Sequence, residues 1–228
     1  MPVVATVVPT NPVAAPSNVA VAPNSSAKTL DLFGTRIRLD LARVPVWGSP
    51  DAPFKLVSLY DYTCHHCREM HPRVAEVQRS FGDKLAVVSQ PMPLDAQCNK
   101  LVIRTSRPQL NACQYAKLGL IVWRAKPKAI QPFDDWVFSF PEPPPLPVVT
   151  NKVLELIGPI AFEAMSRDPW IEQQLQIDIG IFEISQREFG HNQMPQFMIG
   201  GNFIEGVLTT EQLRTEVARV VEPAPAGK

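Results

Sequence analysis

Residues 61–72 of this 228-residue chain read DYTCHHCREMHP and contain a Cys-X-X-Cys motif, Cys64 to Cys67. The run before it, FKLVSLY at 54–60, is apolar and rich in strand-forming residues, so it predicts a buried strand. From 65 to 81 the apolar residues recur at spacings of three and four, which predicts a helix that ends before a glycine. The two cysteines therefore fall where a buried strand turns into a helix.

A second strand follows this helix closely. The run LAVVS at 85–89 is again short and apolar. A strand, a helix and a strand in quick succession form a βαβ unit, whose strands lie parallel and whose crossover is right-handed. The alternating stretch RIRLDL at 36–41 predicts a further strand before this unit.

The position of the motif predicts redox chemistry. A helix N-terminus presents unpaired N–H groups and the positive end of the helix dipole, and both favour a thiolate at Cys64. Cys67 lies one turn further along on the same face, so the two sulfurs can bond or separate. Such a pair has a lowered thiol pKa, and the imidazoles of His66 and, more weakly, His65 are predicted to stabilise the thiolate. A stabilised thiolate stabilises the reduced pair, which makes the disulfide a stronger oxidant.

A metal site is the main alternative for this motif. Structural zinc takes four ligands, usually from two Cys-X-X-Cys pairs, and the remaining cysteines, Cys98 and Cys113, do not form a second pair of this kind. A mixed zinc or copper site built from Cys64, Cys67 and nearby histidines stays open, as does an inert pair in the core. The redox interpretation is preferred, with no metal and no bound cofactor.

The middle of the chain, from about 96 to 190, has a helical pattern. Helices are predicted at 111–124, from an N-cap at Thr150 to Gly158, and from an N-cap at Asp168 to Gly190. A proline-rich loop at 141–147 separates the first of these from the second. The last helix is predicted to turn four apolar side chains inward: Ile171, Leu175, Phe182 and Phe189.

The β pattern returns after residue 190. It predicts strands at 196–199 and 202–204 joined by Gly200-Gly201, and then a helix from a capping box at 209–212 to about Val221. The dipeptide Met194-Pro195 leads into the first of these strands. Proline is tolerated there because a strand start does not need its missing N–H.

Composition limits the function classes and describes the chain ends. Lys and Arg number 22 and Asp and Glu number 22, and this balance argues against a nucleic-acid partner. No apolar run approaches the ~18–20 residues of a membrane-spanning helix. Residues 1–29 are rich in Pro, Ala and Val, and they predict an extended linker rather than a signal peptide. Residues 223–228 predict a disordered tail.

Three of these features together resemble one known class. They are the motif at the strand–helix junction, Pro72 within the helix, and Pro195 before the hairpin. This combination resembles the DsbA-like class of thioredoxin-fold proteins, over roughly residues 30–222. The resemblance implies an α/β thioredoxin-like fold. It places a helical insertion, at about 96–190, between the βαβ half and the C-terminal hairpin–helix half.

The resemblance also implies a role for individual residues. Cys64 is similar to the exposed nucleophile of this class and Cys67 to its resolving cysteine. Pro195 resembles the cis-proline that lies against the disulfide. Met194 then pairs its backbone with an extended substrate strand, a form of β-augmentation that tolerates many substrate sequences.

Two further resemblances widen the range of functions. Residues 61–71 are similar to disulfide isomerases of the DsbC type, and His65 stands where DsbA-like oxidants commonly have proline. An isomerase or reductase of the same fold is therefore an alternative. Residues 93–99 and 112–113 resemble thioredoxin-like domains found beside vitamin K epoxide reductase-type membrane enzymes. This implies a membrane redox partner, either of that type or linked to quinones.

Cys98 and Cys113 have three possible states: a structural disulfide, two free buried thiols, or a second redox pair. The disulfide is favoured because an even number of cysteines fits two pairs. It would close a loop of about 15 residues and stabilise the fold by ~3 kcal/mol. The Cys98–Cys113 bond would also connect the start of the insertion covalently to the first long helix.

We therefore expect a thiol–disulfide oxidoreductase that exchanges disulfides with protein substrates, as an oxidant, outside the cytoplasm. It would be periplasmic or tethered to a membrane. All four histidines, His65, His66, His71 and His191, lie in segments that this fold brings near the site. Only the first two are predicted to act on Cys64.

Overall fold

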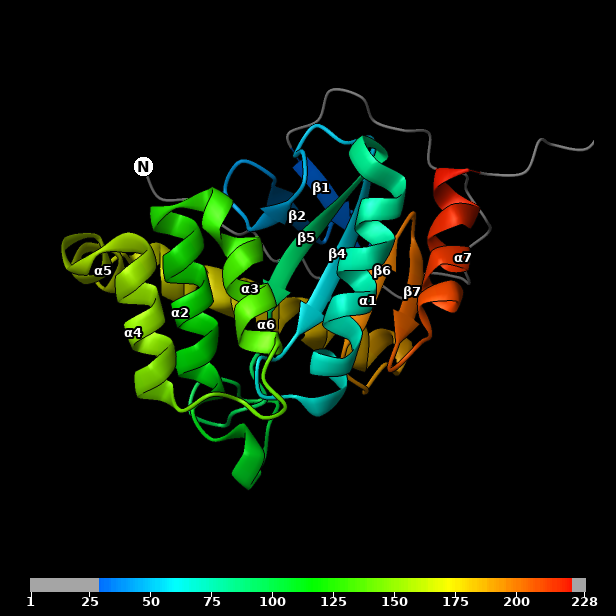
Figure 1. Cartoon of the computed structure of the whole chain (residues 1–228). Helices are drawn as coiled ribbons and strands as arrows, with labels where there is room; N and C mark the ends of the chain where they lie inside the picture. Colours follow the sequence, from blue (N-terminus) through cyan, green and yellow to red (C-terminus); the bar gives the residue numbers. More distant parts are fainter. Residues whose placement is uncertain (1–28, 223–228) are drawn as a thin grey trace, which may run out of the picture.

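The computed structural model describes residues 29–222, which form a five-stranded sheet with helices on both faces (Figure 1). The predicted linker, apart from Thr29, and the predicted tail lie outside the described residues. In the sheet the strands follow the order β3-β5-β4-β6-β7. Figure 1 shows α1 and α7 in front of this sheet and α6 behind it.

The predicted βαβ unit is confirmed. Strand β4 (Phe54–Tyr60) leads into α1 (His65–Phe81), and β5 (Leu85–Pro91) returns parallel to β4. Because the two strands are parallel, their carboxyl ends meet at one edge of the sheet, where Tyr60 pairs with Pro91. That edge carries the Cys-X-X-Cys motif.

The predicted hairpin is also confirmed, and it completes the sheet. Strand β6 (Gln196–Ile199) pairs antiparallel with β4 on one side and with β7 (Asn202–Glu205) on the other. Gly200 and Gly201 both have positive φ, 55° and 82°, as a two-residue type I′ turn requires. At the opposite edge the two-residue strand β3 (Val46–Trp47) pairs antiparallel with β5.

Five helices between β5 and β6 form the predicted helical insertion. They are α2 (Ala112–Ala125), α3 (Ile130–Phe138), α4 (Leu146–Ile157), α5 (Pro159–Ser166) and α6 (Pro169–Phe189). Asp168 caps α6 through its side chain, as predicted, and Gly190 ends it in the left-handed conformation. The last helix, α7 (Thr210–Val221), begins with the predicted capping box at Thr209.

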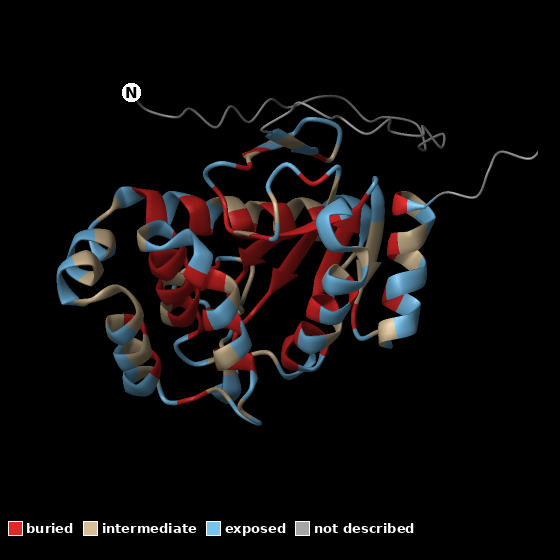
Figure 2. Cartoon of the chain, turned by 45° about the horizontal axis from the view of Figure 1, so that its top comes forward, coloured by how far each residue is buried: buried red, intermediate tan, exposed pale blue. Residues whose placement is uncertain are grey.

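The core lies between the sheet and these helices. Figure 2 shows the central strands buried and the outer helix faces exposed. Every residue of β5 is buried, and so are the last five residues of β4. A strand buried on both faces reads as a continuous apolar run, which is why both strands could be recognised from the sequence. No helix among residues 29–222 is long and apolar enough to cross a membrane.

Cys98 and Cys113 form a disulfide, as favoured from the sequence. The bridge joins the segment that follows β5 to the first turn of α2. The segment between the two cysteines includes only one short 3-10 turn, Arg107–Gln109. The disulfide therefore fixes both ends of a long surface loop.

Two details of the insertion differ from the prediction. Thr150 is not an N-cap, because α4 already begins at Leu146 and the Thr150 hydroxyl donates to the Leu146 carbonyl inside the helix. Proline is tolerated in a first helical turn, so the proline-rich loop ends inside the helix. Phe189 does not point inward: it is 50% exposed and stacks on Phe33, which is outside the main sheet.

The predicted strand at 36–41 is present as β2 (Ile37–Asp40), but it does not join the main sheet. It pairs antiparallel with β1 (Thr29–Leu32) in a separate two-stranded ribbon. Its alternating pattern is typical of a strand with one buried face, and Leu39 is the buried residue.

Candidate functional site

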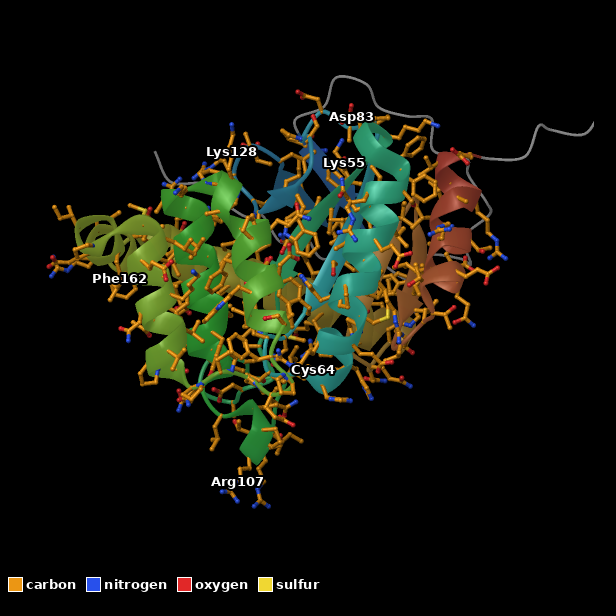
Figure 3. The ribbon with its side chains drawn as sticks, in the orientation of Figure 1. Lys55, Cys64, Asp83, Arg107, Lys128 and Phe162 are labelled. Atoms are coloured by element: carbon orange, nitrogen blue, oxygen red, sulfur yellow. A yellow bond between two sulfur atoms is a disulfide. The ribbon has the colours of Figure 1, made fainter. Side chains whose placement is uncertain are left out.

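Cys64 lies at the carboxyl edge of the sheet, directly after its central strand (Figure 3). It is the N-cap residue of α1, and its side chain makes no capping hydrogen bond to that helix. The Cys64 N–H donates to the Asp61 carbonyl at 3.1 Å, and the Cys64 carbonyl accepts from the Arg68 N–H at 3.0 Å. The sulfur is thus held at the positive end of the helix dipole.

The two thiols of the motif are free and differ in burial. Cys64 is partly exposed, whereas Cys67 is 2% exposed. A hydrogen bond from the Cys67 thiol lowers the pKa of Cys64, and the N–H groups of Cys67 and His66 add to this effect. Burial raises the pKa of Cys67 well above its ordinary value. The pair therefore has one accessible thiol with a lowered pKa and one buried thiol with a raised pKa.

A buried turn positions this pair. The Asp61 carboxylate accepts hydrogen bonds from the Thr63 N–H at 2.6 Å, from the Thr63 hydroxyl at 2.7 Å and from the Leu94 N–H at 2.6 Å. The Asp61 N–H in turn lies 3.4 Å from the Cys67 sulfur. Burial raises the pKa of Asp61 despite its three hydrogen bonds. Asp61 thus connects the turn before Cys64 to the segment that follows β5 by hydrogen bonds.

Arg68 supplies the buried positive charge nearest to the motif in the chain. Its guanidinium donates to the carbonyls of Val137 at 2.7 Å, Phe140 at 3.1 Å and Tyr62 at 2.7 Å. Burial lowers the pKa of Arg68, while attraction to Glu142 and to the thiolates of Cys67 and Cys64 acts in the opposite direction. Arg68 therefore links α1 to the end of α3 and favours negative charge on both sulfurs.

Pro195 and Cys67 line the same small cavity, of about 10 Å³. The Met194–Pro195 peptide bond is cis, as the resemblance implied. Met194 is also buried. The structure therefore brings together Cys67 and Pro195, which are 128 residues apart in the sequence.

The four histidines have different surroundings. His65 and His66 are exposed in the first turn of α1, and no described residue accepts a hydrogen bond from either ring. His71 is buried beside the cavity, and its Nε2 lies 2.7 Å from Asp135 Oδ1. His191 stacks on Phe203 of β7, with ring centroids 4.4 Å apart. The contact of His66 with Cys64 is made by its backbone N–H, while thiolate stabilisation by the two imidazoles stays a prediction.

A second buried polar cluster lies behind the cavity, and the sequence did not indicate it. Asp134 of α3 is fully buried. Its carboxyl oxygens accept from the Tyr62 hydroxyl at 2.5 Å and from the Trp47 indole N–H at 3.2 Å. The Tyr60 hydroxyl, 3.2 Å from that of Tyr62, adds a third aromatic residue. Burial raises the pKa of Asp134 to about 8. This cluster joins the insertion to the sheet directly behind the motif.

Within residues 29–222, no three His, Cys, Asp or Glu side chains are grouped so that they could hold a metal ion. The alternative of a zinc or copper site needs histidine ligands beside Cys64 and Cys67. The nearest histidines in the sequence, His65 and His66, point their rings to solvent instead. The described geometry gives this alternative no complete ligand set.

Comparison with solved structures identifies the fold. ScsC from Proteus mirabilis, in a transitional conformation, superposes with a TM-score of 0.61 at 20% identity, over 80% of this chain and 74% of that one. A periplasmic thioredoxin-like protein from Salmonella enterica serovar Typhimurium has a TM-score of 0.61 at 16% identity, over 78% of this chain and 90% of that one. The thiol-disulfide exchange protein alpha-DsbA2 from Wolbachia pipientis has a TM-score of 0.60 at 17% identity, over 78% of this chain and 87% of that one.

These likenesses confirm the predicted thioredoxin-like fold with its helical insertion. No protein-family model matches the sequence, and the comparison with curated proteins also gives no match. The activity of this chain therefore has to be argued from its own site.

Proposed function

We propose that this protein is a thiol–disulfide oxidoreductase that acts on protein substrates through Cys64 and Cys67, and that it works as an oxidant. One observation carries the proposal. A partly exposed cysteine with a lowered pKa lies at a helix N-terminus and is hydrogen-bonded to a buried cysteine whose pKa is raised. This asymmetry gives the pair a nucleophile and a resolving thiol.

The reaction transfers two electrons from substrate to protein. A substrate thiolate attacks Cys64 in the oxidised pair, the Cys64–Cys67 bond breaks, and Cys67 leaves with the bonding electrons and takes up a proton. A second substrate thiolate then attacks the substrate sulfur of the mixed disulfide, and Cys64 leaves as a thiolate. The substrate gains a disulfide and the protein becomes a dithiol. Because the Cys64 thiolate is stabilised, this direction is favoured.

Met194 and Pro195 are proposed to hold the substrate chain. No described residue hydrogen-bonds to the N–H or the carbonyl of Met194, although its side chain is buried. An extended peptide beside Cys64 would satisfy both groups by β-augmentation. Such backbone pairing suits an enzyme that accepts many unfolded substrates.

The proposed location is outside the cytoplasm, either in a periplasm or at a membrane surface. The Cys98–Cys113 disulfide supports this, because such bonds persist in oxidising compartments. The similar Salmonella protein is also described as periplasmic. The reduced pair then needs an electron acceptor, and we propose a membrane enzyme that is linked to quinones or is of the vitamin K epoxide reductase type.

Two measurements on the purified protein test the proposal. A glutathione redox titration of the Cys64–Cys67 pair should give a potential well above that of cytosolic reductants. The thiolate absorbance should titrate below the ordinary range of a cysteine, and this low transition should be absent in Cys64→Ser. An unshifted thiol together with a potential near cytosolic values would contradict the oxidant assignment.

Trapping tests the roles of the two sulfurs. In Cys67→Ala the Cys64 thiolate should attack a disulfide-bonded, unfolded substrate, release one substrate thiolate and accumulate as a mixed disulfide because the resolving thiol is missing, whereas Cys64→Ser should accumulate none. Refolding of a scrambled disulfide substrate separates an isomerase from an oxidant, since an isomerase restores activity without an added oxidant. Anaerobic zinc and copper titrations address the metal alternative: stoichiometric tight binding without dithiol oxidation would favour it.

A further inference from the structure

The loop that the Cys98–Cys113 disulfide closes is strongly basic. We call residues 96–111 the basic loop. It contains Lys100, Arg104 and Arg107 and no acidic residue. All three cationic side chains are exposed, and none forms an ion pair or a side-chain hydrogen bond with a described residue. By contrast, eight other arginines of the described chain form ion pairs: Arg36, Arg38, Arg73, Arg124, Arg167, Arg187, Arg214 and Arg219.

The basic loop lies at the edge of the sheet that carries the motif. It follows β5, whose carboxyl end is next to that of β4, and Met92 N–H donates to the Tyr60 carbonyl at 2.7 Å. Two residues later, the Leu94 N–H donates to Asp61, three positions before Cys64. Figure 3 shows Arg107 projecting beyond the edge at which Cys64 lies.

The shape of the loop is held in place at its base. The disulfide joins Cys98, near the start of the loop, to Cys113, two residues beyond its end. Asp95 Oδ1 accepts from the Thr105 hydroxyl at 2.9 Å and from the Gln97 N–H at 3.1 Å. The Asn99 side chain donates to the Pro93 carbonyl at 2.8 Å. Because these contacts order the loop in advance, a partner that binds it loses less conformational entropy in the complex.

The loop also exposes apolar surface next to its charges. Ile103 is 100% exposed and Leu110 is 53% exposed. A small anion would not use these side chains, whereas a protein surface would. One fully exposed aliphatic residue is far less than the continuous apolar face with which interfacial segments enter a membrane. A protein partner therefore explains the loop better than a lipid surface does.

We propose that the basic loop makes this protein prefer protein substrates that carry acidic side chains near the reacting cysteine. This inference rests on the proposed function, because exchange at Cys64 is what brings a substrate chain to this edge. Clustered charge of one sign beside a reaction site raises the encounter rate of oppositely charged partners. Lys100, Arg104 and Arg107 would steer such a substrate toward Cys64.

Two synthetic dithiol peptides of equal length test the proposal. One carries three glutamates and the other three lysines, each placed at least four residues from the cysteines, and the thiol pKa values of the two peptides are first measured and matched. With the oxidised full chain at low ionic strength, the acidic peptide should be oxidised about tenfold faster than the basic one. The ratio should approach one in ~1 M salt, where the Debye length is about 3 Å.

A matched pair of variants locates the effect. Arg104→Glu with Arg107→Glu should reverse the preference, whereas Lys126→Glu with Lys128→Glu changes the net charge equally and should retain it. Lys126 and Lys128 are exposed, and Figure 3 shows Lys128 at the opposite end of the molecule from Cys64. Both variants should react with uncharged dithiothreitol at the rate of the unmodified chain, which verifies that each is folded and redox-active.

Three outcomes would overturn the inference. Equal rates for the two peptides, with dithiothreitol exchange intact, would refute the loop preference and leave the proposed function standing. A lack of exchange with dithiothreitol in the unmodified chain would refute the proposed function and the preference together. Loop-dependent binding to vesicles of phosphatidylserine and phosphatidylcholine, without any peptide preference, would assign the basic loop to a lipid surface.

Discussion

Replacing Asp134 with asparagine should change how the stability of this protein depends on pH. The carboxyl group is fully buried, and burial raises its pKa to about 8 from 3.8. Between these two values the folded protein holds a proton at Asp134 that the unfolded chain has released. The stabilisation linked to this proton is complete below pH 3.8 and is lost progressively as the pH rises toward 8.

The expected magnitude follows from the size of the shift. Each pH unit inside this window costs about 1.4 kcal/mol of unfolding free energy for one proton. From pH 4 to pH 7 the unmodified chain should therefore lose about 4 kcal/mol through Asp134 alone. The amide introduced by Asp134→Asn cannot ionise, but it keeps the shape of the side chain and an oxygen that can accept from Trp47. Between pH 4 and pH 7 the unfolding free energy of the variant should therefore rise by about 4 kcal/mol relative to that of the unmodified chain.

Urea unfolding at pH 4, 5, 6 and 7 measures the difference, with the redox state of Cys64 and Cys67 held fixed throughout. Asp178 is also buried with a raised pKa, but it is present in both proteins, so its contribution cancels in the comparison. As a control, Asp83→Asn replaces an exposed carboxyl group. Its unfolding free energy should change with pH in the same way as that of the unmodified chain. If the unfolding free energy of Asp134→Asn also follows that of the unmodified chain from pH 4 to pH 7, burial does not keep Asp134 protonated and the reasoning fails.

Three further variants test other contacts. Cys98→Ser with Cys113→Ser opens a loop with a sequence separation of 15 and should cost ~3 kcal/mol in urea unfolding, with an unchanged Cys64–Cys67 potential; a shifted potential would show that the two pairs are coupled. Gly119→Ala places a Cβ against the Tyr62 hydroxyl and should cost about 1–3 kcal/mol by thermal unfolding, so an unchanged melting temperature would contradict the tight packing. Arg68→Met leaves three carbonyls without their charged donor. It should cost about 3 kcal/mol in urea unfolding and raise the pKa in the thiolate titration, and a titration that does not move would exclude an electrostatic role for this arginine.

The parts of the fold that could be predicted are those with local signals. The buried strand at 54–60, the helix at 65–81 and the hairpin with Gly200-Gly201 each show their period and their ends within a few residues. The strand β3 has only two residues and no period to detect. Threonine is a common cap, which is why the sequence indicates Thr150, whereas the helix start at Leu146 depends on how the preceding prolines are packed.

The site could be predicted less completely than the fold. Cys64 and Cys67 form a motif, and the dipeptide Met194-Pro195 gains meaning from its place before the hairpin. Arg68 and Asp134 give no signal, because charged residues are usually exposed and most partners of these two lie more than 60 residues away. The exposed rings of His65 and His66 could not be foreseen either, since the sequence does not say which side of the first turn faces solvent.

The direction of the last helix has a practical consequence for use of this protein as a solid-phase reagent. Helix α7 runs alongside α1 in the same direction, because Thr210 lies near Glu76, and Glu222 pairs with Lys84 at 3.1 Å. A helix of 17 residues is roughly 25 Å long, so α7 ends about that far from the Cys64 sulfur at the start of α1. If the protein is coupled to a resin through a tag that follows α7 in the sequence, Cys64 should face the solution that flows past.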